Sequence, residues 1–134
     1  PGESQLYVLR KVAPTPSRGH PLVAEAMVVG EARKFPAVLI VPDFAALEHR
    51  LDVLGRPRGS REELVTRTDV LSLYNEVIEP LNRDLAQFER LKKVALLPAE
   101  FSIATGELTP TLKLRRRVVL ERWQAVVDRL YADA

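Results

Sequence analysis

The sequence contains no cysteine, a single methionine (Met27) and few aromatic residues, which make up 6% of its 134 residues. Without cysteine, the chain cannot form disulfides, use a thiolate nucleophile or bind zinc through sulfur. Its aromatic side chains are too scarce to form the stacking platforms that single-stranded nucleic acids require. No apolar run reaches the roughly 18 residues of a membrane-spanning helix, and no signal-peptide pattern opens the chain. With 46% hydrophobic and 28% charged residues, the composition indicates a soluble globular domain.

Several motifs of known catalytic chemistry are also missing. There is no G-x-S-x-G turn for an acyl-serine mechanism and no G-x-x-x-x-G-K-[ST] loop for phosphates. The two histidines, His20 and His49, lack ligand spacing, so we expect no metal site. The acidic residues are scattered over predicted helix faces, which is typical of solvated surface.

The start of the chain suggests a piece of a longer protein. It begins with Pro1 and its only methionine is Met27, so we expect a fragment or a processed product. Prolines and a glycine crowd the segment APTPSRG at 13–19, which is incompatible with a helix or a central strand. We therefore predict a lead-in or linker over residues 1–19 and one domain over residues 20–134.

Three strands are predicted from apolar runs. The segments 26–29 and 35–42 flank a short polar turn at 31–34, which favours an antiparallel hairpin. The second segment, FPAVLIVP, is apolar throughout, which indicates burial on both faces of a sheet. A third strand is expected at 94–98, VALLP.

Capping residues mark two helix starts. Asp43 is a good N-cap, and helical spacing of apolar residues follows it as far as Gly55. Ser60 and Glu63 match a capping box, in which each side chain bonds to the backbone N–H of the other residue.

Two further helices complete the predicted fold. A long amphipathic helix begins at about Thr68 and contains Pro80, near which we expect a kink. The last helix is predicted over 114–131. The class is α+β, with a roughly three-stranded sheet, the hairpin plus a third strand, packed against amphipathic helices and a C-terminal helix last. The expected apolar face of the long helix contains Leu71, Tyr74, Val77 or Ile78, Leu81, Leu85 and Phe88.

The segment GELTPTLKLRRRVV, residues 106–119, holds the most unusual charge pattern. Lys113 lies between two leucines, and three arginines follow at the start of the last predicted helix. Cations oppose the macrodipole at a helix N-terminus, so a carboxylate elsewhere in the fold or an anionic ligand would have to compensate. Alternatively, Lys113 lays its stem on apolar surface and keeps its ammonium in water. The residues alone leave both interpretations open.

This segment resembles the C-terminal lysine motif of the adenylate-forming acyl-CoA synthetases, especially their long-chain fatty acid branch, in which the pattern is close to G-E-L-T-P-T-x-K-[LI]-[KR]-R. Three other segments resemble the same family in the same order. They are KVAPTP at 11–16, HPLVAEAMVVGEARKFPAVLIVPDF at 20–44 and LNRDLAQFERLKKVALLP at 81–98.

The resemblance implies the C-terminal domain of a long-chain fatty acid–CoA ligase. Such enzymes join a fatty acid to ATP, giving acyl-adenylate and pyrophosphate, and then transfer the acyl group to the thiol of coenzyme A (CoA). A large N-terminal domain holds ATP, Mg²⁺ and the fatty acid, and the small C-terminal domain is a lid that rotates between the two steps. We therefore expect this chain's partner to be that N-terminal domain, and the chain alone to bind no cofactor and to be inactive.

The same resemblance assigns roles to individual residues. Lys113 aligns with the lysine that reaches into the active site during adenylation, and its leucine neighbours would anchor the loop. The residue types themselves, rather than the resemblance, indicate that Thr109, Pro110 and Thr111 set the conformation of that loop, because Pro110 fixes one backbone angle and the threonines can hydrogen-bond local backbone.

Residues near CoA are implied less directly. Gly30 aligns with a family glycine whose neighbouring backbone lines the pantetheine tunnel, although a glycine that ends a strand needs no ligand to explain it. Arg33 and Lys34, or the arginines 115–117, of which Arg115 and Arg116 are the candidates, would contact the CoA phosphates. The alternative for each is solvated surface or contact with the large domain. The family's hinge sequence, of the type G-R-x-K-[DE], is absent, so no hinge residue is assigned.

Two other functions are weighed. The run KLRRR suggests nucleic-acid binding, but 20 basic against 18 acidic residues leave a net charge of only +2, which argues against it. A non-catalytic interaction domain is the other alternative, and an apolar face exposed in the isolated fragment would favour a dimer. We expect a cytoplasmic location, with any membrane contact made through the absent domain.

Overall fold

A computed structural model of the chain describes residues 21–30, 33, 35–83 and 90–132. The predicted lead-in at 1–19, together with Lys34, Leu85 and Phe88, lies outside the described residues. Within them the elements confirm the predicted α+β class. They are β1 (Val23–Val29), β2 (Ala37–Pro42), α2 (Phe44–Val53), α3 (Arg61–Leu64), α4 (Thr68–Asn82), β3 (Lys93–Leu96), α5 (Arg116–Arg122) and α6 (Gln124–Tyr131).

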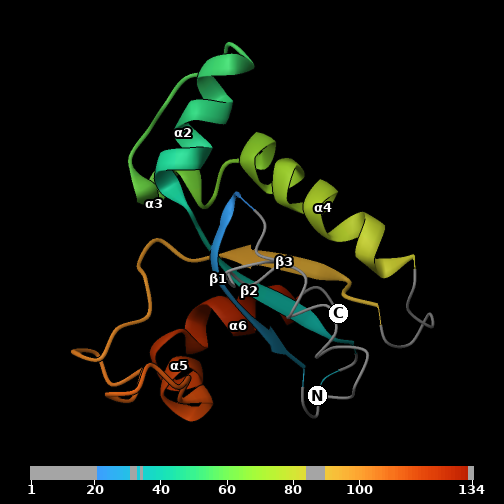
Figure 1. The fold of residues 1–134 in the computed structure, drawn as a ribbon. Helices are drawn as coiled ribbons and strands as arrows, with labels where there is room; N and C mark the ends of the chain where they lie inside the picture. The colour runs from blue at the N-terminus through green and yellow to red at the C-terminus, as the bar shows by residue number, and fades with distance from the viewer. Residues whose placement is uncertain (1–20, 31–32, 34, 84–89, 133–134) are drawn as a thin grey trace.

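The three strands form one mixed sheet in the order β1-β2-β3, with β2 in the centre (Figure 1). β1 and β2 form the predicted antiparallel hairpin, in a register that places Val29 opposite Ala37. β3 pairs with β2 in parallel, with Val94 opposite Val38. The connection between these two parallel strands contains α2, α3 and α4, as a parallel pair requires a long crossover.

Helices cover both faces of the sheet, which explains the uninterrupted apolar run of β2. Val38 and Ile40 face the core shared with α2, α3 and α4. Leu39 and Val41 face the second core, which α5 and α6 close (Figure 1). All of these side chains are fully buried. Because successive residues of a strand point to opposite faces, a central strand covered on both sides must be apolar throughout.

The predicted helix starts are confirmed. The carboxylate of Asp43 accepts a hydrogen bond from the backbone N–H of Ala46 at 3.1 Å, which caps α2. At α3, Glu63 N–H donates to Ser60 Oγ and Ser60 N–H donates to Glu63 Oε1, each at 3.2 Å. These reciprocal bonds satisfy backbone donors that the first turn of a helix leaves free.

The prediction of one continuous helix over 114–131 is wrong. The segment forms two helices, α5 and α6, which meet at Trp123, where the backbone has φ −105° and ψ 24°. At this break the indole Nε1 of Trp123 donates to Glu107, a contact between distant residues that helical periodicity does not encode. The predicted kink at Pro80, which lies inside α4, stays a prediction.

Candidate functional site

Residues 108–114 form a tight hairpin, here called the lysine loop. Its base is closed by an antiparallel bridge between Leu108 and Leu114. Above the base, Thr109 N–H donates to the carbonyl of Lys113 at 2.9 Å, and Leu112 N–H donates to the carbonyl of Thr109 at 2.7 Å. The loop therefore has a defined backbone although it belongs to no helix and to none of the three sheet strands.

Polar side chains hold this backbone. Thr109 Oγ1 accepts a hydrogen bond from the N–H of Lys113 at 3.0 Å and lies 3.1 Å from the hydroxyl of Thr111. Pro110, in the turn between them, has a fixed φ and reduces the entropy that the loop loses on folding. The sequence TPT thus forms the local contacts that a short turn requires.

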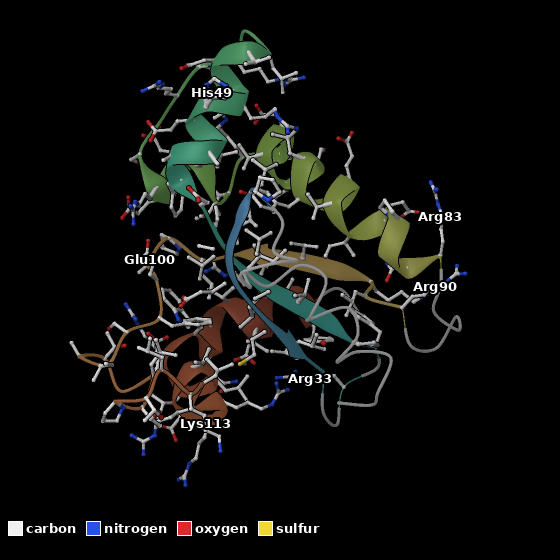
Figure 2. The ribbon with its side chains drawn as sticks, in the orientation of Figure 1. Arg33, His49, Arg83, Arg90, Glu100 and Lys113 are labelled. Carbon is white, nitrogen blue, oxygen red and sulfur yellow. The ribbon has the colours of Figure 1, made fainter. Side chains whose placement is uncertain are left out.

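The side chain of Lys113 is exposed and lies at the outer edge of the molecule, away from the sheet (Figure 2). Among the described residues, no carboxylate forms an ion pair with its ammonium. A long cation on a hydrogen-bonded loop can therefore reach an anion outside this domain. Of the two compensating groups considered from the sequence, a carboxylate of this domain and an anionic ligand, the carboxylate does not pair with Lys113 within the described residues.

The two leucines beside Lys113 differ. Leu114 is half-buried and packs against the core under α5 and α6, as expected of an anchor. Leu112 is 67% exposed, so the expectation that it anchors the loop inside this domain is wrong. Its φ of 65° lies in the left-handed region, which costs an L-residue about 1–2 kcal/mol. The backbone turns there so that Leu112 points into solvent.

A residue missed by sequence reasoning supports the loop from below. Glu107 is completely buried, the one buried charged side chain in the described part of the chain. Its carboxylate accepts hydrogen bonds from Thr105 Oγ1 at 2.6 Å, Arg122 Nη1 at 2.5 Å and Trp123 Nε1 at 3.0 Å. A weak signal was present in the sequence, since a buried indole N–H needs an acceptor.

The three arginines after the loop have different environments. Arg116 Nη1 donates to the carbonyl of Val28 at 2.5 Å, and Arg117 pairs with Glu121 at 3.2 Å. Arg115 is exposed, and its backbone N–H donates to the carbonyl of Glu107 at 2.7 Å. Consecutive residues on a helix point in different directions, so the run does not present three cations to one ligand.

The structure brings together three of the residues considered for CoA. Gly30, Arg33 and Arg116 line a small cavity of about 140 Å³ between the end of β1 and helices α5 and α6. Arg33 is engaged within the domain, since its guanidinium pairs with Asp128 at 3.0 Å and lies 4.9 Å from the ring centre of Tyr131.

Gly30 also has a structural role. Its φ is +137°, and a Cβ at this position would lie 2.8 Å from Pro36 Cα and 3.0 Å from the carbonyl oxygen of Phe35. The close approach of this backbone therefore requires glycine without any ligand.

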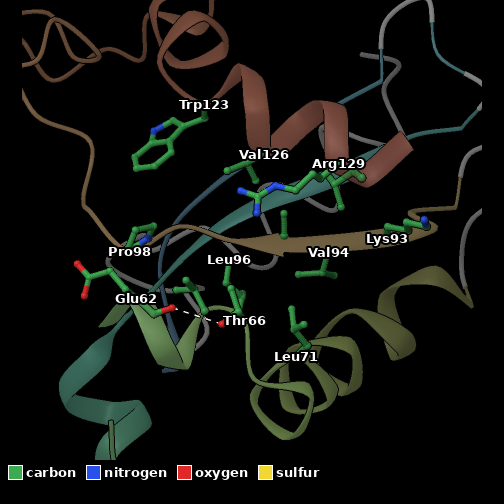
Figure 3. Close-up of a pocket in the computed structure, with 13 residues that line it drawn as sticks. Glu62, Thr66, Leu71, Lys93, Val94, Leu96, Pro98, Trp123, Val126 and Arg129 are labelled. Atoms are coloured by element: carbon green, nitrogen blue, oxygen red, sulfur yellow. Dashed lines mark hydrogen bonds between the residues drawn. The ribbon is translucent and has the colours of Figure 1, made fainter. Parts of the chain in front are cut away.

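A larger apolar groove of about 430 Å³ lies beside β3, between α6 and the segment of α3 and α4 (Figure 3). Leu71, Val94, Leu96 and Val126 form its floor and walls, and Trp123 closes one end. This groove is an apolar surface of the kind on which a dimer of the isolated chain would depend, and the dimer itself stays a prediction.

Shifted titrations occur away from the lysine loop. The Arg67 guanidinium, which donates two hydrogen bonds to Asp69, lowers the pKa of that carboxyl to about 2. Burial raises the pKa of Glu25, although a hydrogen bond from Phe101 N–H lowers it in part. Burial also raises the pKa of Tyr131. The shifts of Glu25 and Tyr131 follow from burial and that of Asp69 from an internal ion pair, so each has a structural cause within the domain.

Comparison with known proteins identifies the class of domain. The chain matches the family model "AMP-binding enzyme C-terminal domain" over residues 10–134. The chain belongs to this family, as its resemblance to the acyl-CoA synthetases indicated.

Three relatives of the chain are all named long-chain-fatty-acid–CoA ligases. The chain is 34% identical over 115 residues to the long-chain-fatty-acid–CoA ligase FadD15 of Mycobacterium tuberculosis, covering 85% of this chain and 19% of that protein. It is 35% identical over 105 residues to the long-chain-fatty-acid–CoA ligase heimdall of Drosophila melanogaster, covering 77% of this chain and 14% of that protein. Human ACSBG1, also named a long-chain-fatty-acid–CoA ligase, is 31% identical over 131 residues, with 84% and 18% covered. The chain thus spans less than a fifth of each of these relatives.

Solved structures confirm the fold. The adenylation domain of a carboxylate reductase from Mycobacterium chelonae superposes with a TM-score of 0.63 at 22% identity, covering 84% of this chain and 16% of that one. The A-PCP didomain of a carboxylic acid reductase from Segniliparus rugosus, solved in complex with AMP, gives the same score and identity, with 84% and 14% covered. Within the described residues, no helix is both long and apolar enough to span a membrane.

Proposed function

We propose that the chain is the mobile C-terminal lid of an AMP-forming long-chain fatty acid–CoA ligase, and that Lys113 is its adenylation lysine. The observation that carries the proposal is the position of Lys113, exposed and without a carboxylate partner among the described residues, on a loop fixed by its own hydrogen bonds. The named relatives are long-chain fatty acid–CoA ligases, which supports the same activity for the parent of this chain.

The chemistry explains why a lysine is useful there. In adenylation, a carboxylate oxygen of the fatty acid attacks the α-phosphorus of ATP, and the bond to the pyrophosphate oxygen breaks. Two anionic groups must approach each other, and an ammonium between them offsets the repulsion and stabilises the crowded transition state. Lysine suits this task because its charge is compact and its stem is flexible. In the second step the CoA thiol attacks the acyl carbonyl, AMP leaves, and the lysine is no longer required.

The other residues have supporting roles in this proposal. Thr109, Pro110 and Thr111 hold the loop from which the ammonium projects. Gly30, Arg33 and Arg116 line the cavity at which CoA would pass, and Arg33 would exchange its contact with Asp128 for a phosphate. Lys34 and Arg115 remain candidates for the same anion.

Other components belong to the N-terminal domain in this proposal. No group of acidic or histidine side chains within the described residues could hold a metal ion, so we assign Mg²⁺ and the ATP site to that domain. The isolated chain is accordingly predicted to be inactive, and a cytoplasmic location also stays a prediction.

The proposal is tested in the full-length parent by measuring the two half-reactions separately. Lys113→Ala should lower fatty-acid-dependent pyrophosphate exchange by about 10²- to 10³-fold, by analogy with the loss of a single oxyanion donor. Thioester formation from supplied acyl-adenylate should be nearly unchanged. Arg117→Ala, which removes an exposed cation of the same run that pairs with Glu121, is the matched control and should preserve adenylation. Equal losses in both half-reactions, or in neither, would refute the assigned role.

A further inference from the structure

We infer that Glu107 is a positioning residue for adenylation, which fixes the lysine loop through a buried carboxylate. The inference rests on the proposed function of Lys113. The name Glu107 clamp is used below for this carboxylate and its three donors, Thr105, Arg122 and Trp123.

The clamp is a polar network centred on one fully buried carboxylate. Glu107 has no exposed surface, and its two oxygens receive hydrogen bonds from a hydroxyl, a guanidinium and an indole. A buried carboxylate is costly unless it is paired and hydrogen-bonded, and here both conditions are met. Because the donors come from two segments, the network joins the chain before the lysine loop to the junction of α5 and α6.

The clamp connects to Lys113 through the backbone. The carbonyl of Glu107 accepts the N–H of Arg115 at 2.7 Å, so this residue closes the hairpin on one side while its side chain anchors it on the other. The next pair along the hairpin is the bridge between Leu108 and Leu114, and the turn with Lys113 lies above it. A shift of Glu107 would therefore displace both strands of the loop together.

The arrangement favours a role in geometry over a role in stability alone. A buried ion pair can often be replaced by apolar residues without loss of stability, so its retention is weak support for folding energy. Directional bonds to three donors do, however, fix one orientation of the loop base. A catalytic cation is sensitive to such an orientation, since a misplacement of about 1 Å can cost on the order of 10²-fold in rate.

The test uses the full-length ligase and the variant Glu107→Gln, which keeps the shape but directs an amide NH₂ at groups that are themselves donors. Adenylation should fall about 10- to 100-fold, while thioester formation from supplied acyl-adenylate should change less than about twofold. Glu121→Gln removes the same charge from an exposed ion pair with Arg117 and should change neither step. Trp123→Phe removes one donor of the clamp and keeps an aromatic ring. It should give a smaller selective loss, and it replaces Glu107→Gln if that variant does not fold.

The Lys113→Ala background separates positioning from general damage. If the clamp acts through the lysine, Glu107→Gln in this background should reduce adenylation no further. Equal losses in both half-reactions, or a full additional loss in the Lys113→Ala background, would overturn the inference. If Lys113→Ala alone leaves adenylation intact, the proposed function fails. If Lys113→Ala impairs adenylation and neither clamp variant does, only the positioning role fails.

Discussion

Gly30→Ala should be the most destabilising glycine substitution in the described part of the chain. The backbone at Gly30 has φ +137°, and the added Cβ would meet Pro36 Cα at 2.8 Å and the Phe35 carbonyl oxygen at 3.0 Å. Backbone atoms of a turn cannot move aside as a flexible side chain can. A sparsely populated φ costs about 1–3 kcal/mol and overpacking about 1–3 kcal/mol. The lower entropy of the unfolded alanine chain returns only about 0.4–1 kcal/mol.

The expected net loss is therefore about 1–5.6 kcal/mol, with a middle value of about 3 kcal/mol, in the free energy of unfolding, measured by urea denaturation of the 134-residue chain. Two glycines serve as matched controls. Gly55→Ala, at φ +70° with open space around the Cβ, should cost about 1 kcal/mol. Gly59→Ala, with an ordinary contact of 3.5 Å to Glu63, should be nearly neutral. A loss of stability at Gly30 no larger than that at Gly55 would refute the steric reasoning. The proximity of Gly30 to CoA would then be the better explanation for this glycine.

Two further predictions concern charge and strain. In the folded chain the pKa of Asp69 is lowered from 3.8 to about 2. Its ion pair therefore stabilises the folded chain at pH values above the pKa that Asp69 has in the unfolded chain, and this stability is lost as the pH falls from about 5 to 2. Asp69→Asn should therefore cost about 1 kcal/mol at pH 7, a value reduced for solvent screening, and almost nothing at pH 2 in urea titrations; an equal cost at both pH values would contradict the assignment. Leu112→Gly removes a strained left-handed residue that is 67% exposed, so the unfolding free energy should stay within about 1 kcal/mol. The same change should slow adenylation in the full-length ligase severalfold by loosening the lysine loop, and an unchanged rate would show that the rigidity of the loop is unimportant.

Local features of this fold were readable in the sequence. The caps at Asp43 and at Ser60 and Glu63 are hydrogen bonds between residues three positions apart. A short stretch of sequence therefore includes both partners of each bond, and the caps can be predicted from it. The double-sided burial of β2 was visible for a similar reason, because a central strand must be apolar at every position.

The features that sequence reasoning missed depend on distant residues. At the break between α5 and α6, the indole N–H of Trp123 donates a hydrogen bond to Glu107, sixteen positions earlier. The helical periodicity of residues 114–131 does not predict this hydrogen bond or the break. Glu107 received no role from the sequence although it lies in the segment 106–119, because one carboxylate in a turn looks the same whether it is buried or solvated. The direction of the Leu112 side chain depends on a left-handed backbone conformation at this residue, and a leucine in the sequence does not predict that conformation.

The charge at position 113 can be removed and restored chemically, which tests the central claim directly. This chain has no cysteine, so Lys113→Cys introduces the only thiol of the domain. Alkylation with bromoethylamine then rebuilds a side chain of lysine length that ends in an ammonium. In the full-length ligase, fatty-acid-dependent pyrophosphate release should be lost in Lys113→Cys and should return after alkylation, while treated wild-type enzyme is unchanged. Full release before alkylation, or no recovery after it, would contradict the role of Lys113 as the adenylation cation.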